Sequence, residues 1–186
     1  MSAPGDGRWV AFVHGADATG TLTALAGVFS TRGVSFDSLS TGGVADGVGL
    51  IVVTFTATER RQRLLMRTVR RLASVRAAEV RAADDPAVRA AAVVHLPVTA
   101  AGFAPPADAP VRWSGDPAAG QPVLVEGALV DVERVVAEAR AGGAVAAATV
   151  LLPPAEPGPA DAAFTTLPPV ADGAPQERRT PPPRLG

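Results

Sequence analysis

Residues 9–33 decide the fold, and they read WVAFVHGADATGTLTALAGVFSTRG. The first five are apolar residues that favour a β-strand, and a polar loop follows from His14 to Thr19. Apolar side chains then recur at helical spacing, at Leu22, Leu25, Ala26, Val28 and Phe29. Gly33 stands where a helix C-terminus commonly takes a left-handed residue. The stretch therefore predicts a strand, a loop and a helix that ends at Gly33.

The next fifty or so residues continue the alternation of strands and helices. Val34 to Thr41 is expected to form an edge strand, and residues 42–47, which include an Asp-Gly pair, supply the chemistry of a hairpin turn. Leu50 to Thr56 is the strongest strand signal in the chain, and we expect it to be central in a sheet. A second helix opens at Thr58-Glu59, and Val75 to Arg81 is a short last strand. The residues expected to share one face of the second helix are Leu64, Leu65, Val69 and Leu72.

The resulting order is β-α-β-β-α-β, in which two helices cover one face of a four-stranded antiparallel sheet. Because the opposite face of such a sheet carries no helix, we expect it to need a partner, most simply a second copy of the chain.

Residues 87–152 repeat this pattern incompletely. The expected elements are strands within Val88–Val98, Pro122–Glu126 and Val145–Leu152, and a helix over Asp131–Arg140 that Gly142-Gly143 ends. Between Pro97 and Pro110, where a first helix belongs, proline and glycine are too frequent for a helix to form. We interpret this region as a degenerate second unit that has lost its first helix.

Ten of the 18 prolines lie between Pro153 and Pro183, where large apolar residues are few. Such a stretch buries too little surface to offset the entropy of ordering it, so we expect a disordered tail, with a ligand for a proline-binding module as the alternative. The predicted organisation is α+β, with one domain at 8–83, a second at 87–152 and the tail at 153–186.

The composition of the 186 residues excludes several classes of function. A formal charge of −1, from 17 basic and 18 acidic residues, gives no global field for nucleic acid or an anionic membrane. Cysteine is absent, which excludes thiolate catalysis and cysteine-based zinc sites. The sequence has no apolar run long enough to span a membrane, and its polar, Gly-rich first residues lead us to expect no leader segment and a soluble, cytoplasmic protein.

A search for catalytic and cofactor motifs finds none. His14 and His95 have no metal-ligand spacing, and a phosphate-binding P-loop would need a lysine that the chain lacks. Ser30 and Ser114 lie near glycines but form no nucleophile elbow, and we interpret them as ordinary polar residues. We expect no enzyme activity, no metal and no cofactor.

The second predicted helix and the strand after it are rich in arginine from Arg60 to Arg81. RNA-recognition modules have the same order of elements, but they place stacking aromatic residues on the central strands, and here Phe55 is alone on the third strand. We favour a solvated helix face, which could dock an acidic partner, and keep an RNA-binding module as an alternative.

The segment from His14 to Leu39 resembles the ACT domain, a small amino-acid-sensing module, and more narrowly the regulatory (small) subunit of acetolactate synthase. The motifs that carry the resemblance are Gly20-Thr21-Leu22, Val28-Phe29-Ser30-Thr31-Arg32-Gly33 and Ser35-Phe36-Asp37-Ser38-Leu39. The likeness covers residues 8–83 well, whereas Val123 to Leu151 is only faintly similar to the end of that family's second domain. The resemblance implies a ferredoxin-like ACT domain followed by a degenerate ferredoxin-like domain.

The resemblance also implies a function: a non-catalytic, homodimeric subunit that binds a branched-chain amino acid, valine first, and regulates the acetolactate synthase catalytic subunit. In this family the effector lies between the strand-to-helix loop and the second strand of a neighbouring copy. The first turn of a helix suits a carboxylate because its N–H groups lack partners and carry partial positive charge. Carried over to this chain, Gly20, Thr21 and Leu22 line the helix N-terminus, Asp17 and Ser35 orient the polar end, and Val34 and Phe36 shape the pocket.

Two positions depart from the family, because Asp17 and Ser35 stand where it usually has asparagine. Asp17 would attract an ammonium but repel a nearby carboxylate, and Ser35 has a shorter reach than an amide. These changes would weaken, alter or abolish valine sensing. A second hypothesis, which the truncated second domain favours, is a free-standing ACT protein that senses another small ligand or serves as a dimerising scaffold.

Overall fold

The computed structural model describes residues 5–16, 19–45, 47–100 and 102–153 of the chain. It divides into the units Met1–Pro154 and Ala155–Gly186, of which only the first contains described residues. The predicted tail at 153–186 therefore lies, beyond Pro153, outside the described residues.

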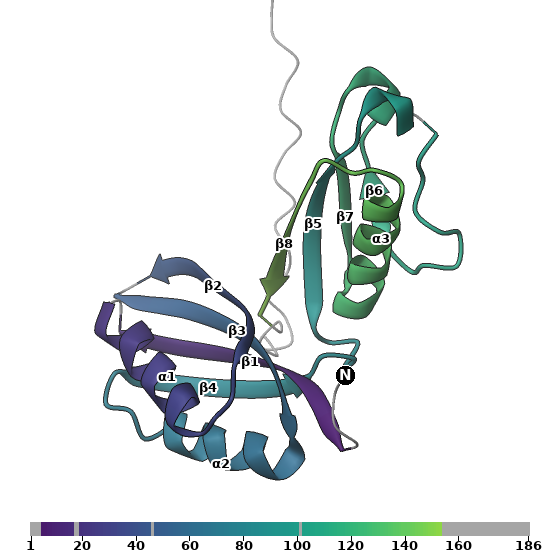
Figure 1. Cartoon of the computed structure of the whole chain (residues 1–186). Coiled ribbons are helices and arrows are strands. Elements are labelled where there is room, and N and C mark those ends of the chain that lie inside the picture. The colour runs from purple at the N-terminus through teal and green to yellow at the C-terminus, as the bar shows by residue number, and fades with distance from the viewer. Residues whose placement is uncertain (1–4, 17–18, 46, 101, 154–186) are drawn as a thin grey trace, which may run out of the picture. The chain divides into compact units, whose positions relative to one another are not determined.

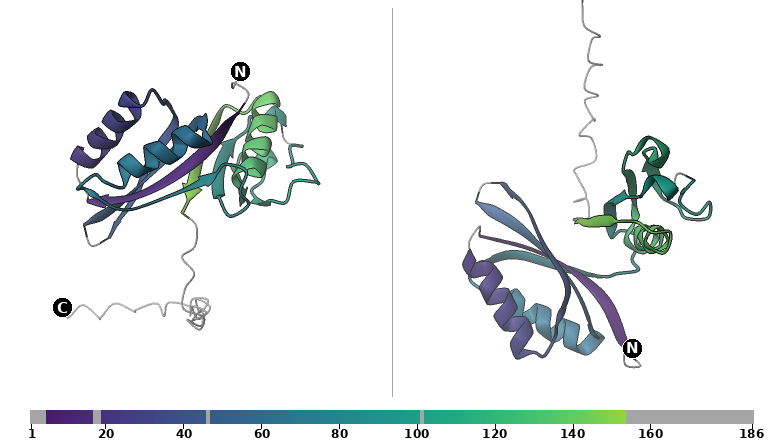
Figure 2. Two further views of the ribbon diagram at one scale, coloured as in Figure 1. Left: turned by 90° about the horizontal axis from the view of Figure 1, so that it is seen from below. Right: turned by 45° about the horizontal axis from the view of Figure 1, so that its top comes forward.

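The first half of the described chain forms the predicted β-α-β-β-α-β arrangement. Its elements are β1 (Asp6–Ala16), α1 (Thr19–Thr31), β2 (Phe36–Ala45), β3 (Val48–Thr58), α2 (Glu59–Val69) and β4 (Val75–Ala82). The strands form an antiparallel sheet in the order β2-β3-β1-β4, so β2 is an edge strand and β3 is central, as predicted. Both helices lie on one side of this sheet (Figures 1 and 2).

A core of β-branched, aliphatic and aromatic residues holds the two helices to the sheet. Alternate residues of β3, namely Ile51, Val53, Phe55 and Ala57, share it with Leu25, Val28 and Phe29 of α1 and with Leu65, Met66 and Val69 of α2. Phe29 is its aromatic centre, because its ring centroid lies 4.6 Å from that of Phe36 and 5.2 Å from that of Phe55. Aromatic pairs at such separations add to the free energy of burial.

The turn after α1 has the predicted geometry. Gly33 has a φ of +62°, and the backbone N–H groups of Gly33 and Val34 donate to the carbonyls of Ser30 and Phe29. These bonds satisfy carbonyls that a helix end otherwise leaves without partners.

The buried face of α2 differs from the prediction. Leu64 is 38% exposed, whereas Met66 and Gln62 are buried together with Leu65 and Val69. These four buried positions follow the i, i+3, i+4, i+7 spacing of one helix face, so the helix is rotated relative to the prediction.

The second half repeats the topology of the first without its first helix. Its elements are β5 (Arg89–His95), β6 (Arg112–Ser114), β7 (Val123–Ala128), α3 (Leu129–Ala141) and β8 (Ala146–Leu152), and the sheet order is β6-β7-β5-β8. This order matches that of the first sheet position by position. Between β5 and β6 the described residues contain only the 3₁₀ turn Val98–Ala100 as a helical element, as the loss of a helix predicts. The short strand β6 was not predicted.

The face of the first sheet that has no helices is not bare, contrary to expectation. Val10, Phe12 and Val52 are almost fully buried, and they belong to one hydrophobic cluster with residues of β5, β7, α3 and β8. Arg8 on β1 also donates two hydrogen bonds, of 2.6 and 2.7 Å, to the carboxylate of Glu133 on α3. The hydrogen bond to Glu133 raises the pKa of Arg8 above its ordinary value. The second half of this chain therefore covers the part of that face around Val10, Phe12 and Val52.

Candidate functional site

The strand-to-helix connection at the start of α1 is built around a close approach of β1 to the helix. A Cβ atom added to Gly15 would lie 2.8 Å from the Cγ2 atom of Thr21 and 2.9 Å from the Ser74 carbonyl oxygen. The Thr21 side chain is buried and its hydroxyl donates to the Ala16 carbonyl at 3.0 Å, while the Ala16 N–H donates to Ser74. Thr21 therefore fixes the connection from inside the protein, and Gly15 leaves the space for it.

Gly20 faces open space in the first turn of α1. It is exposed, and no atom lies within 4 Å of an added Cβ. The first turn carries no acidic side chain, and Leu22 packs against the core with part of its surface accessible. A small anion could approach the backbone here without meeting a negative side chain from this turn. Asp17, the predicted partner for an ammonium group, lies outside the described residues.

The other predicted site residues lie at the opposite end of α1. Val34 is buried in the core, Ser35 is exposed, and Phe36 is partly buried against Phe29. The 13 residues of α1 separate this group from Gly20, which corresponds to about 20 Å along the helix. One chain therefore does not bring the two halves of the predicted site together.

The exposed edge of the first sheet connects these two ends. Phe36 at the start of β2 pairs with Phe55, whereas Ala45 at its end pairs with Val48, which in turn pairs with Ala16, the residue at the end of β1. The end of β2 thus lies beside the N-terminal end of α1, and its start lies beside the C-terminal end. Within one chain, Ser35 and Gly20 therefore lie at opposite ends of the first sheet.

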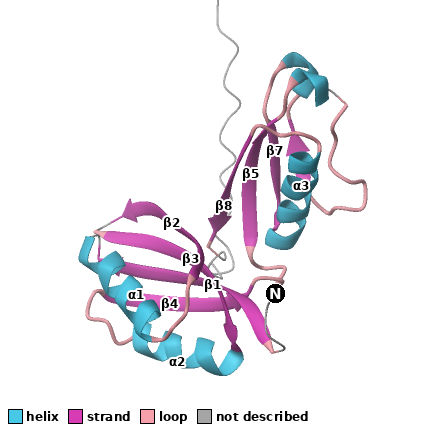
Figure 3. Cartoon of the chain, in the orientation of Figure 1, coloured by secondary structure: helices cyan, strands magenta, loops and turns pink. Residues whose placement is uncertain are grey.

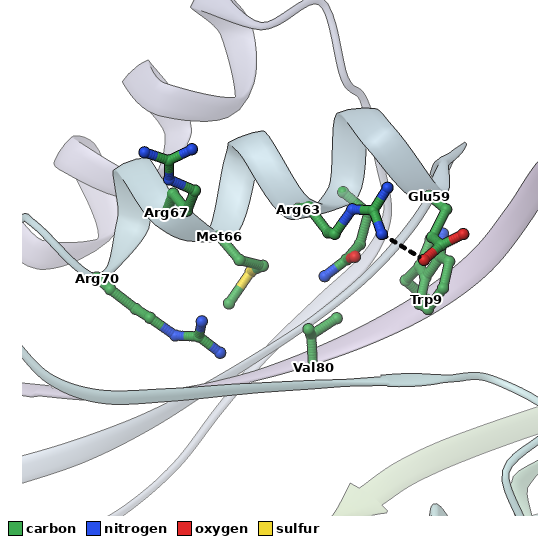
Figure 4. A pocket seen from close by; sticks show the side chains of 8 residues that line it. Trp9, Glu59, Arg63, Met66, Arg67, Arg70 and Val80 are labelled. Carbon is green, nitrogen blue, oxygen red and sulfur yellow. Dashed lines mark hydrogen bonds and ion pairs between the residues drawn. The ribbon is translucent and has the colours of Figure 1, made fainter.

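A separate open cavity of about 440 Å³ lies beside α2, with Trp9, Met66 and Val80 contributing apolar surface (Figure 4). Its arginines have other partners or point elsewhere. Arg63 donates to Glu59 at 2.8 Å, Arg70 donates through Nε to the Ala78 carbonyl, and the Arg67 side chain points away from Met66. The predicted solvated face thus agrees with the described contacts of these arginines.

The sheet face that RNA-recognition modules use for stacking bases is occupied here, because Val10, Phe12 and Val52 are buried on it. The described residues contain no group of three or more side chains suited to hold a metal ion. None of the helices in the described part of the chain is long and apolar enough to cross a membrane.

Sequence reasoning missed the role of Gly15 and the buried position of Gln62 on α2. A signal for the first was present, because a glycine near the end of an apolar strand commonly marks a close approach of another backbone or side chain.

The two sheets have equivalent strand orders, β2-β3-β1-β4 and β6-β7-β5-β8. Together with the helices α1, α2 and α3 they form an ACT-like fold in tandem. In particular, the fold resembles the small subunit of acetolactate synthase from Thermotoga maritima, with a TM-score of 0.54 at 15% identity over 78% of this chain and 96% of that chain. The regulatory subunit of aspartate kinase from Thermus thermophilus matches with a TM-score of 0.42 at 15% identity, over 72% of this chain and 92% of that chain. The ACT domain of GTP pyrophosphokinase from Chlorobium tepidum has a TM-score of 0.36 at 18% identity, over 41% of this chain and 86% of that chain. No family model and no curated protein matches the sequence.

Proposed function

We propose that this chain is a non-catalytic regulatory subunit that binds a branched-chain amino acid, valine first, between two copies and modulates an acetolactate synthase catalytic subunit in the cytoplasm. Residues 8–83 would be the effector-binding ACT domain and 87–152 the second domain. The observation that carries the proposal is the position of Gly20 and Ser35 at opposite ends of the first sheet, because a second copy can complete the site.

The register of β2 makes such a dimer geometrically simple. An antiparallel pairing of two β2 strands centred between Ser40 and Thr41 sets Phe36 of one copy opposite Ala45 of the other. Since Ala45 lies at the sheet end where α1 begins, the partner's Ser35 and Phe36 would approach Gly20 and Leu22. The β2 edge is accessible for this pairing, because Leu39 and Thr41 are exposed.

The chemistry of the two halves is complementary to an apolar amino acid. The N–H groups of the first turn of α1 would hold the carboxylate. Asp17 and the partner's Ser35 offer oxygen acceptors for the ammonium group, and Leu22 with the partner's Phe36 would contact an aliphatic side chain. Binding that favours one of two states of the assembly would then shift the activity of the catalytic partner.

A Gly20→Asp variant is expected to lose most of its affinity for valine. Asp is compatible with the first turn of a helix, but its carboxylate would occupy the position of the ligand carboxylate and repel it. We expect the dissociation constant to rise by more than about tenfold, as measured by calorimetry with valine, leucine and isoleucine.

The matched control is Gly27→Asp, which makes the same change on the same helix at an exposed position with equally open space. This variant is expected to bind like the wild type. Equal binding by Gly20→Asp and wild type would contradict the assignment of the site.

A free-standing sensor or dimerising scaffold is the second candidate. The described residues between β5 and β6 contain no α-helix, which favours this candidate, since the loss of that helix would remove part of a docking surface for a catalytic subunit. Co-expression with an acetolactate synthase catalytic subunit separates the candidates. A stable complex with altered valine inhibition is expected under our proposal, whereas two proteins that purify separately would favour the free-standing sensor.

A further inference from the structure

The last strand, β8, is an edge strand whose outer side pairs with no other described strand. It runs antiparallel to β5 over all seven of its residues, Ala146 to Leu152, and closes the sheet order β6-β7-β5-β8 (Figures 1 and 3). The N–H and carbonyl groups on the free side of such a strand can bind a further strand.

The sequence of β8, Ala-Ala-Ala-Thr-Val-Leu-Leu, has no charge and no proline. Proteins commonly protect an edge with charged residues, bulges or short strands. On the other edges of the two sheets, β2 carries Asp37 and two register shifts, β4 carries Arg76, Glu79 and Arg81, and β6 has three residues that include Arg112. Among the described edge strands, β8 alone has neither a charged residue nor a register shift.

Exposed apolar side chains lie beside this edge. Val150 is 55% exposed and Leu152 38%, and Ala146 and Ala148 are exposed at alternate positions of the same strand. The surface continues into a cavity of about 350 Å³ that Val150 and Ala148 line together with Val93, Leu124 and Trp113. An exposed apolar surface of this kind is typical of an interaction site.

The residue order of β8 is complementary to itself in an antiparallel pairing centred on Thr149. In that register Ala148 faces Val150, Ala147 faces Leu151 and Ala146 faces Leu152, so a small side chain always opposes a large one. The two threonines at the centre can form a cross-strand pair, and no two charges of the same sign oppose each other.

We propose that β8 pairs with β8 of a second copy of this chain in this register. The contact joins two β6-β7-β5-β8 sheets into one of eight strands around a two-fold axis at Thr149. Such an interface is closed, because the same strand serves both copies. The proposal is independent of the effector site, which uses β2 and the first sheet.

Disulfide cross-linking tests the contact directly, because the chain has no cysteine of its own. Directly opposed residues of an antiparallel pair have Cβ atoms within reach of a disulfide. Full-length Thr149→Cys is expected to form a covalent dimer under mild oxidation, seen on a non-reducing gel. Ala146→Cys alone is the matched control, since two copies of residue 146 would be about 20 Å apart.

The register has its own test, because Ala146 and Leu152 face each other across the two-fold axis. A mixture of Ala146→Cys and Leu152→Cys chains is expected to cross-link into a mixed dimer. A failure of Thr149→Cys to cross-link, or equal cross-linking of Thr149→Cys and Ala146→Cys alone, would overturn the proposal.

Charge at residue 149 tests the interface without a covalent bond. Thr149→Arg and Thr149→Glu each place two like charges at the axis, and each is expected to weaken association about tenfold or more in sedimentation equilibrium. A one-to-one mixture of the two variants should restore the wild-type assembly, which a folding defect could not do. If both variants associate as tightly as the wild type, β8 does not join the copies. A dimer through β2 at the proposed effector site would persist in either variant. A variant that still forms dimers but no larger assembly has therefore lost the β8 contact and kept the β2 contact.

Discussion

Replacing Phe29 with alanine is expected to lower the free energy of unfolding by about 3–5 kcal/mol. Phe29 is almost fully buried at the centre of the first core, where its ring contacts those of Phe36 and Phe55. Truncation removes both ring pairs and leaves a cavity that the sheet cannot readily fill. Because small proteins are stable by only about 5–15 kcal/mol, the change is a large part of the total. Urea unfolding followed by circular dichroism measures it.

The neighbouring substitution Ser30→Ala is the control, because Ser30 is exposed on the same helix. We expect it to change stability by less than about 0.5 kcal/mol. A loss below about 1 kcal/mol in Phe29→Ala would show that the three rings do not form the core described above. We also expect Phe29→Ala to weaken binding at the proposed effector site, since Phe36 packs on Phe29 and directly follows Ser35.

The first sheet was predictable because its signals are local. The apolar run Leu50 to Thr56 has apolar residues on both alternating faces, which fits a central strand, and Gly33 has the positive φ that its place after a helix requires. The same run also held a signal that we interpreted incompletely. A strand that is apolar on both faces predicts that both are buried, and Val52 is indeed buried on the face without helices.

The prediction of the buried face of α2 was wrong at Leu64, because hydropathy was weighted above spacing. Leu64 is more apolar than Gln62, yet the positions that face the core follow the helical period through Gln62, Leu65, Met66 and Val69. The long Gln62 side chain can contribute its methylene groups to this face, so its residue type concealed its position.

The strand β6 could not be predicted from local sequence, because its three residues, Arg112, Trp113 and Ser114, are too few to establish an alternating pattern. Its pairing with Leu124, Val125 and Glu126 of β7 defines it, and that pairing depends on the chain between them returning to the same sheet. Tertiary contacts decide such short strands more than intrinsic preference does.

For the candidate site, sequence identified the exposed glycine of the helix N-terminus but not the residue that holds that helix in place. Motif positions such as Gly20 are found by likeness to a family. Gly15 was not singled out, because its role depends on Thr21 and Ser74, which approach it from a helix and from the turn before β4. No local sequence pattern indicates that Gly15, Thr21 and Ser74 lie close together.

A Gly15→Ala substitution is therefore expected to have the second large effect, a loss of about 2 kcal/mol in the free energy of unfolding. The added methyl group would lie 2.8 Å from Thr21 Cγ2 and 2.9 Å from the Ser74 carbonyl, and neither a buried side chain nor a backbone oxygen can move cheaply. Since Thr21 also bonds to the Ala16 carbonyl, relief of the contact would displace the first turn of α1. Valine affinity, measured by calorimetry, should fall together with stability.

Gly20→Ala is the matched control, because it adds the same methyl group five residues later in open space. Alanine favours the helical state, so stability should stay the same or rise by up to about 1 kcal/mol. The comparison separates crowding from a general effect of removing a glycine, since only Gly15 has close neighbours. If both variants unfold at the wild-type urea concentration, the approach of β1 to Thr21 is looser than the structure shows, and Thr21 does not fix the start of α1.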